Sequence, residues 1–244
     1  MTDIYNKLIT RQIEIFTPEE QELLKTTPIV VMGSGGLGGT IIEQFIRAGF
    51  EELTIVDQDV FDETNLNRQI RSNIDTIGKS KVQITKNEAQ KINPNANITA
   101  YDLTVDSSNI TEILDGNKIL IDAVDNVYTR VMISREARKQ KMVFVHSAVE
   151  KTSGQLSVFE SDSVSYEELF KFKSFGKTLE ESKDYLLSLT RKKPQVLGIT
   201  PSIFGALEVN ETIKYILGKD GVVLAPNVLQ WDLFDISSFR IIEF

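Results

Sequence analysis

A glycine cluster near the N-terminus constrains the fold of this chain more than any other feature. Residues 33–39 read Gly-Ser-Gly-Gly-Leu-Gly-Gly, between the apolar run 28–32 and a helical pattern over 41–48. Glycine lets the backbone turn tightly and approach a phosphate, and free N–H groups at a helix start attract negative charge. The cluster predicts a strand–turn–helix unit that binds an adenine nucleotide, unless the turn only packs helix on strand. The expected phosphate-binding glycines are Gly33, Gly35, Gly36 and Gly38.

The second expected strand, 53–57, ends on a carboxylate. Asp57 lies 19 residues beyond Gly38. At that position a carboxylate can accept hydrogen bonds from the ribose hydroxyls of a bound nucleotide. The glycine cluster and Asp57 together indicate an adenine nucleotide, but they do not distinguish NAD from ATP.

Polar and cationic residues beyond the second strand favour ATP over NAD. Asn65 and Arg68 follow Asp57, and Lys81 lies at the start of the next expected helix, 79–93. Two cations and an amide directed at one edge of the sheet suit a triphosphate, because its leaving pyrophosphate accumulates negative charge. Solvated surface charge is the alternative for Arg68 and Lys81.

Two carboxylates follow a later expected strand, 119–122. Asp122 ends that strand, and Asp125 lies three residues further, before an expected helix over 127–140. A carboxylate at the carboxyl end of a parallel strand is well placed to hold Mg²⁺ against phosphate oxygens. Both carboxylates are therefore candidate Mg²⁺ ligands, and capping of the following helix is an alternative or additional role for Asp125.

Strands alternate with helices through the first two thirds of the chain. This alternation predicts an α/β fold with a Rossmann-like, mostly parallel sheet, helices on both faces and an antiparallel C-terminal extension. Besides those named, strands are expected at 98–101, 142–149 and 155–160, a helix at 200–217, and two short strands within 228–243 separated by residues 235–238.

The chain is expected to form a single domain over residues 1–244. Its expected parts are N-terminal helices at 1–27, a nucleotide-binding core at 28–160, a mobile crossover or lid segment at 161–195, and a C-terminal helix with strands at 196–244.

Composition excludes several classes of site. The sequence contains no cysteine, which rules out disulfides, thiolate nucleophiles and thiolate zinc sites. A net charge of −8 argues against a broad nucleic-acid or anionic-membrane surface. The polar N-terminus and the lack of a long apolar run favour a cytoplasmic location.

With these residues assembled, the chain resembles the ThiF/MoeB family of ubiquitin-activating-enzyme-like adenylyltransferases over most of its length. The matching motifs, in order, are Arg11-Gln12, the glycine cluster, Asp57-x-Asp59, Asn65-Leu-x-Arg68-Gln69, Gly78-x-x-Lys81, Asp122-x-x-Asp125-Asn126 with Arg130, and the strand 154–159.

The resemblance implies a role for each matching position. Asp57 would bind the ribose, Arg68 and Lys81 would hold phosphates, and Asp125 would bind Mg²⁺. Arg11 would reach the ATP of the partner subunit in a homodimer. The resemblance thus implies Arg68, Lys81, Asp125 and Arg11 as catalytic residues, with further nucleotide contacts at Asp59, Asn65, Gln69 and Asn126.

Two departures from the family pattern concern cysteine. Family members often carry Cys-x-x-Cys pairs for structural zinc, whereas the matching stretch here begins Ser161-Asp-Ser. Many members also have a nucleophilic cysteine before the last long helix, and residues 189–194 contain none. Zinc binding and a cysteine thioester are excluded, while ATP and Mg²⁺ remain the expected cofactors.

The expected reaction is attack of a substrate carboxylate on the α-phosphorus of ATP, giving an acyl-adenylate and pyrophosphate. Missing thiols favour a small-molecule carboxylate in cofactor biosynthesis, as in the HcgE-type branch that adenylates a guanylylpyridinol precursor. The alternative is the C-terminal glycine of a ubiquitin-like or sulfur-carrier protein. Two other classes stay open: a non-catalytic ATP-binding scaffold, and an NAD-dependent oxidoreductase, in which Arg68, Lys81 and Asp125 have no role.

Three further features have both a structural and a functional interpretation. The lysine-rich stretch within 161–195 either closes over an anionic substrate or is solvated. His146 is either a satisfied structural histidine, which is favoured, or a substrate contact. Phe170, Phe172 and Phe175 are expected to make core or dimer contacts rather than to form a stacking platform for a ligand. Cations of the lysine-rich stretch include Lys171, Lys173, Lys177, Arg191, Lys192 and Lys193.

Overall fold

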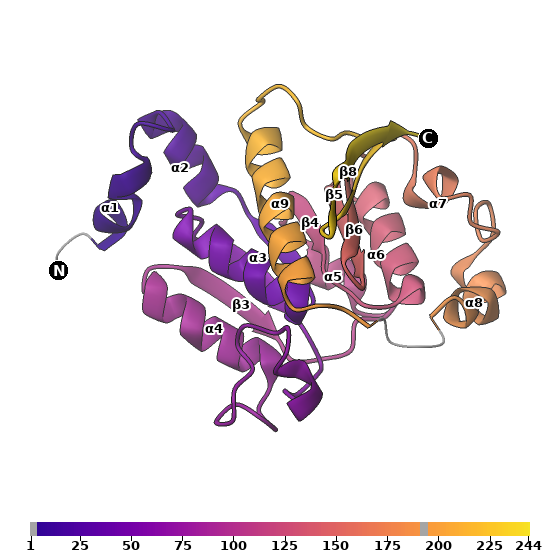
Figure 1. Cartoon of the computed structure of the whole chain (residues 1–244), viewed down its shortest axis with the longest axis horizontal. Coiled ribbons are helices and arrows are strands. Elements are labelled where there is room, and N and C mark those ends of the chain that lie inside the picture. The colour runs from indigo at the N-terminus through magenta and orange to yellow at the C-terminus, as the bar shows by residue number, and fades with distance from the viewer. Residues whose placement is uncertain (1–3, 191–194) are drawn as a thin grey trace.

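The computed structural model describes residues 4–190 and 195–244. Within them, eight strands form one sheet in the order β3-β2-β1-β4-β5-β6-β7-β8 (Figure 1). The strands are β1 (Ile29–Met32), β2 (Glu52–Val56), β3 (Asn97–Tyr101), β4 (Ile119–Asp122), β5 (Val143–Glu150), β6 (Ser153–Phe159), β7 (Asn227–Asp232) and β8 (Asp235–Glu243).

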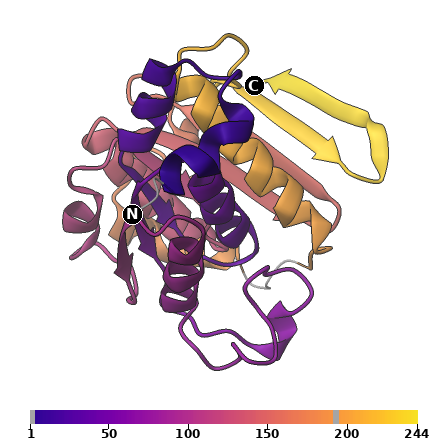
Figure 2. The ribbon, with the colours of Figure 1, turned by 90° about the vertical axis from the view of Figure 1, so that its left-hand side faces the viewer.

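The sheet has a parallel part and an antiparallel part. Strands β1 to β5 pair in parallel, and β6, β7 and β8 extend the sheet by antiparallel pairing from β5 onward. Figure 2 shows β7 and β8 as a yellow hairpin that extends beyond the other strands. This arrangement confirms the predicted Rossmann-like α/β fold with an antiparallel C-terminal extension.

Helices cover both faces of the sheet. Helices α3, α4 and α9 lie on one face, and α5, α6, α7 and α8 lie on the other (Figure 1). The described helices are α1 (Ile4–Ile9), α2 (Pro18–Thr26), α3 (Gly36–Arg47), α4 (Lys81–Ile92), α5 (Ile110–Leu114), α6 (Val127–Lys139), α7 (Tyr166–Leu169), α8 (Leu179–Ser188) and α9 (Ile199–Ile216), with short 3-10 helices η1 (Thr10–Gln12) and η2 (Glu63–Asn65). Across the described ranges, no helix combines the length and apolarity needed to cross a bilayer.

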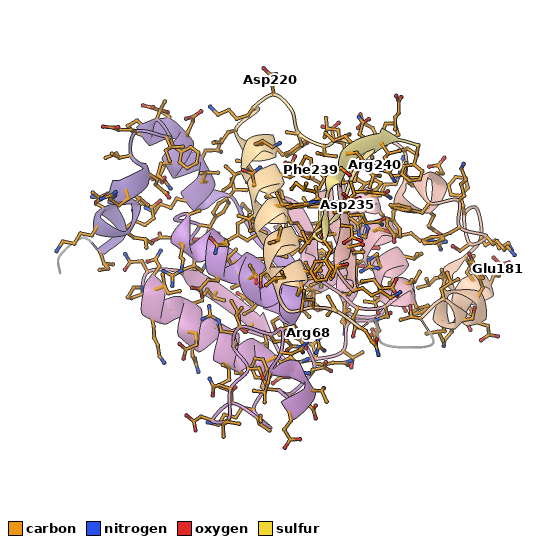
Figure 3. The ribbon with its side chains drawn as sticks, viewed as in Figure 1. Arg68, Glu181, Asp220, Asp235, Phe239 and Arg240 are labelled. Atoms are coloured by element: carbon orange, nitrogen blue, oxygen red, sulfur yellow. The ribbon has the colours of Figure 1, made fainter. Side chains whose placement is uncertain are left out.

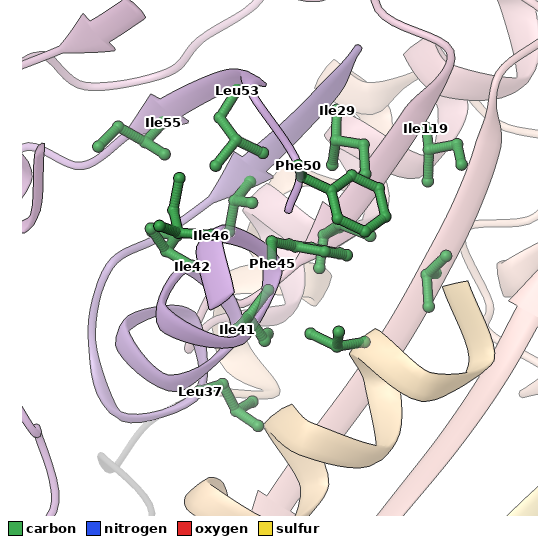
Figure 4. Close-up of a cluster of buried hydrophobic side chains, with 14 of the residues drawn as sticks. Ile29, Leu37, Ile41, Ile42, Phe45, Ile46, Phe50, Leu53, Ile55 and Ile119 are labelled. Carbon is green, nitrogen blue, oxygen red and sulfur yellow. The ribbon is translucent and has the colours of Figure 1, made fainter. Parts of the chain in front are cut away.

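The central strands are buried on both sides, so their side chains divide between two cores. Along β1, Val31 packs into the core beneath α3 and α9, whereas Val30 packs into the core beneath α6. Figure 4 shows the first core, in which Phe45 and Phe50 meet edge to face at 4.8 Å between ring centroids. Alternation on a strand covered on both faces explains the continuous apolar runs in the sequence.

Several element boundaries differ from those expected. Helix α3 begins at Gly36 rather than Ile41, because the glycine cluster itself forms its first turn. The short helix α5 was not expected. Residues 235–238 belong to β8, and the break between the last strands lies at Leu233 and Phe234.

The stretch 161–195 forms two capped helices where it is described. The side chains of Ser165 and Thr178 each accept a hydrogen bond from the third residue of the helix that follows, α7 and α8 respectively. Phe170 and Phe172 pack against Tyr166 and the core beneath α6, whereas Phe175 is 53% exposed. Arg191, Lys192 and Lys193 lie outside the described residues, and a lid role for the stretch stays a prediction.

Candidate functional site

A cavity of about 270 Å³ opens at the carboxyl ends of β1, β2 and β4. Strand β1 pairs with β2 on one side and β4 on the other, and the chain runs outward through β2 and β3 before it crosses back to β4. The crevice at such a switch point is where open α/β sheets bind ligands. We refer to it below as the nucleotide cavity, after the ligand that the sequence predicts. The predicted site residues that line it are Gly33, Gly35, Gly36, Asp57, Asp59, Arg68, Gln69, Lys81, Asp125 and Asn126.

Two glycines of the cluster are required by close backbone contacts. Gly33 has a φ of +100°, and a Cβ there would lie 2.6 Å from the carbonyl oxygen of Ala123. A Cβ at Gly38 would lie 1.9 Å from the carbonyl oxygen of Gly33. Gly38 does not line the cavity, so its role is to pack α3 against the turn that forms the cavity wall.

Asp57 connects the glycine turn to the end of β2. One carboxylate oxygen accepts hydrogen bonds from the Ser34 N–H at 2.7 Å and the Ser34 hydroxyl at 3.0 Å. The other oxygen accepts from the Asp59 N–H at 2.8 Å. These bonds fix the carboxylate at the cavity wall, where it can accept further hydrogen bonds from a ribose.

Both predicted phosphate-binding cations line the nucleotide cavity. Lys81 is 6% exposed, and its Nζ lies 2.9 Å from a carboxylate oxygen of Asp59. Arg68 lies near the lower end of α9 in Figure 3, and its Nη1 donates to the Thr64 carbonyl and the Asn67 side chain. Neighbouring acceptors therefore hold both cations beside the cavity.

Two residues that follow β4 have different roles: Asn126 caps a helix, and Asp125 faces the cavity. Asn126 caps α6, because its side-chain oxygen accepts from the Thr129 N–H at 2.8 Å. The carboxylate of Asp125 lines the cavity without a hydrogen bond or ion pair to any residue the structure describes. Mg²⁺ is commonly bound by one or two carboxylates plus substrate phosphates, so this single carboxylate fits a nucleotide-bound Mg²⁺.

A charged network lies buried behind Asp125. Arg130 Nε lies 2.5 Å from a carboxylate oxygen of Asp122, and Arg130 also donates to the Val124 carbonyl at 2.6 Å. His146 Nδ1 lies 2.7 Å from the same Asp122 oxygen. Burial opposes ionisation of Asp122, but the Arg130 charge and the His146 hydrogen bond outweigh it and lower the pKa of the carboxyl. The network holds Arg130 at the cavity wall with Asp122 ionised.

A second cavity, of about 620 Å³, continues from the first. The two share four lining residues: Asp125, Arg130, Ala148 and Val149. In the sheet register, Ala148 is opposite Gln155, Gln155 is opposite Gln230, and Gln230 is opposite Arg240. All four line the second cavity, so a row of polar side chains leads across β6 and β7 to β8.

Three predicted site residues do not line the nucleotide cavity. Gly38 packs the turn, as described above. Asn65 is buried, and its side-chain oxygen accepts from the Asp62 N–H, which stabilises η2. Arg11 lies in η1, is exposed and is away from the cavity of its own chain.

Sequence reasoning missed other residues of the two cavities. Arg130 belongs to a matching family motif, and its place eight residues after Asp122 is the one sequence signal for an ion pair from α6 back to the end of β4. Gln155 and Leu103–Val105 carry no such signal, because strand register and the path of a loop bring them to the cavities. His146 is fully buried with both ring nitrogens hydrogen-bonded, which confirms the favoured structural interpretation.

Comparisons with known proteins agree with this architecture. The sequence profile of the ThiF family matches residues 9–244. The chain is 34% identical over 242 residues to a probable molybdopterin-synthase adenylyltransferase of Porphyra purpurea, covering 98% of this chain but only 60% of that protein. It is 30% identical over 220 residues to the SAMP-activating enzyme E1 of Haloferax volcanii, covering 90% and 78%. The structure of E. coli MccB with ATP has the same fold, with a TM-score of 0.76 at 18% identity over 99% of this chain and 70% of MccB.

Proposed function

Because this chain belongs to the ThiF family, we propose that it is an adenylyltransferase that activates a carboxylate with ATP. One observation carries the proposal: the glycine turn, Asp57, two held cations and Asp125 line one cavity that opens into a second. The nucleotide would occupy the first cavity, and the carboxylate substrate would enter through the second.

The proposed reaction is a displacement at phosphorus. A carboxylate oxygen attacks the α-phosphorus of ATP, the bond to the β-phosphate oxygen breaks, and pyrophosphate leaves. The substrate is already ionised at neutral pH, so no proton has to be removed. Catalysis would therefore depend on positioning and on stabilisation of developing charge.

The lining residues divide this work by position. Asp57 would bind the ribose, and the glycine-turn amides would approach the phosphates. Arg68 and Lys81 would stabilise charge on the leaving pyrophosphate. Asp125 would hold Mg²⁺, which supplies positive charge against the phosphate oxygens when bound.

For the substrate, we propose the C-terminal carboxylate of a peptide or of a carrier protein. The second cavity supports this proposal, because amide side chains from successive strands line its floor. A relative of Thermus thermophilus, 29% identical, is named a sulfur carrier protein adenylyltransferase. A small guanylylpyridinol-like carboxylate, as in the HcgE-type branch, is the second candidate, and the absence of cysteine from the chain favours it.

We further propose a homodimer in which Arg11 completes the partner's nucleotide cavity. Arg11 is exposed and lies beside two exposed apolar side chains, Ile13 and Ile15, which are 66% and 67% exposed. Exposed isoleucines next to an arginine that does not line the cavity of its own chain support a protein contact at η1.

Pyrophosphate release from Mg·ATP by the purified protein tests the proposed function. We expect release that depends on an added carboxylate, with peptides and carrier proteins compared against small carboxylates. Turnover with small carboxylates alone would select the second candidate. Tight ATP binding without pyrophosphate release from any of them would contradict the adenylyltransferase proposal and favour a scaffold.

A further inference from the structure

His146 is the only histidine in the sequence, and it joins the buried charged network to the second cavity. Its side chain is fully buried. Nδ1 lies 2.7 Å from a carboxylate oxygen of Asp122, and Nε2 lies 3.2 Å from the side-chain nitrogen of Gln155. Gln155 lines the second cavity, whereas His146 lines neither cavity.

The chemistry of Asp122 determines the tautomer of His146. An ionised carboxylate only accepts hydrogen bonds, so His146 must donate its Nδ1–H to Asp122. Burial lowers the pKa of His146, which keeps the ring neutral at neutral pH. A neutral ring protonated at Nδ1 offers only a lone pair at Nε2.

The tautomer in turn determines the orientation of the Gln155 amide. A lone pair at Nε2 requires a donor, so the amide nitrogen of Gln155 must face the ring. Its carbonyl oxygen is then turned away from His146, and none of the residues in 4–190 and 195–244 donates a hydrogen bond to it. Gln155 is the register partner of Ala148, which lies where the two cavities join.

We propose that His146 is a positioning residue that holds the Gln155 carbonyl oxygen toward the second cavity, where it accepts a hydrogen bond from a substrate N–H close to the reacting carboxylate. The proposal rests on the proposed adenylation and narrows its substrate class. A carboxylate with a neighbouring backbone N–H is the C-terminus of a peptide or protein chain.

Two synthetic peptides that differ in one N–H group test this inference. One ends in glycine, and the other ends in N-methylglycine, which lacks the last amide hydrogen. Their affinities for the full chain are measured by calorimetry with a non-hydrolysable ATP analogue. We expect wild type to bind the glycine peptide roughly 3- to 10-fold more tightly, the range of one hydrogen bond. Equal affinity, or no binding of either peptide, would overturn the inference.

A matched pair of substitutions separates positioning from packing. His146→Gln can still donate to Asp122 and accept from Gln155, so it should keep the preference for the glycine peptide. His146→Met fills a similar volume without either bond, so the preference should fall to about 1. If His146→Met does not fold, Gln155→Leu removes the same acceptor at a half-buried position. A preference that persists in Gln155→Leu would overturn the inference.

Nitrogen NMR of histidine-labelled protein gives a readout independent of turnover. Because the chain has one histidine, both ring-nitrogen signals belong to His146, and their couplings to the two carbon-bound ring protons distinguish Nδ1 from Nε2. We expect the neutral Nδ1–H tautomer at pH 7, and a neutral Nε2–H tautomer or an imidazolium would overturn the inference. Selective binding of the glycine peptide without pyrophosphate release would support the inference while contradicting the proposed function. Adenylation without selectivity would do the reverse.

Discussion

Lys81 is a nearly buried cation at the nucleotide cavity, and its ion-pair partner Asp59 has a side chain that is 48% exposed. A bound triphosphate would supply further negative charge at the same place. We expect Lys81→Ala to lower the rate of pyrophosphate release by about 10²–10³, as loss of one charge-stabilising donor typically does. Lys91→Ala on the same helix is the control, because that side chain is 71% exposed. Near-normal rates in the Lys81 variant would contradict its assignment.

Asp125 is the carboxylate available to Mg²⁺ once Asn126 has taken the capping role. We expect Asp125→Asn to slow pyrophosphate release by roughly 10²-fold and to raise the Mg²⁺ concentration that gives half-maximal rate. Kinetics at a series of Mg²⁺ concentrations measure both effects. Asp115→Asn at the exposed end of α5 serves as the control. A slower variant with an unchanged Mg²⁺ requirement would assign Asp125 another role.

At the scale of elements, α9 carries a carboxylic acid into the core. Glu208 is fully buried, and neither of its oxygens has a hydrogen-bond partner among the described residues. Burial, reinforced by the negative charge of Asp122, raises the pKa of Glu208 well above 4.5. The folded chain therefore keeps a proton that the unfolded chain releases above about pH 4.5. The free energy of unfolding therefore falls as the pH rises from about 4.5 to the raised pKa of Glu208 in the folded chain, by about 1.4 kcal/mol per pH unit.

Replacing Glu208 by glutamine removes this titration. We expect Glu208→Gln to show a smaller fall in the free energy of unfolding between pH 5 and pH 8, and to be more stable than wild type at the upper end. Urea unfolding at both pH values measures the difference. Glu112→Gln on the exposed side of α5 should leave the wild-type slope unchanged. An equal slope in the Glu208 variant would show that the carboxyl is ionised in the folded chain.

Elements differ in how far the sequence alone predicts them. The parallel strands and the glycine turn were predictable, because buried apolar runs and glycine at a fixed spacing are local signals. The start of α3 was not, since the cluster serves as both turn and first helical turn. The second cavity was not predictable either: the neighbours of Gln155 are set by the pairing of β5, β6 and β7, which periodicity does not encode.

At the scale of the whole molecule, the nucleotide cavity of one chain lacks Arg11. If Arg11 acts on the partner's cavity, mixing an Arg11→Ala chain with a Lys81→Ala chain forms heterodimers with one complete site. Random exchange should then restore about a quarter of wild-type pyrophosphate release, because half of the dimers are mixed and half of their sites are complete. Sedimentation of wild type checks the dimer itself. No recovery after verified exchange would place Arg11 outside the reaction.

Strand β5 stands between two kinds of sheet, parallel toward β4 and antiparallel toward β6. The residues suited to phosphate chemistry lie mainly on the parallel side, whereas Gln155, Gln230 and Arg240 lie on the antiparallel side. The cavities have only four described lining residues in common. Substitutions in β6, β7 and β8 can therefore reshape the second cavity while Gly33, Asp57 and Lys81 on the parallel side stay as they are.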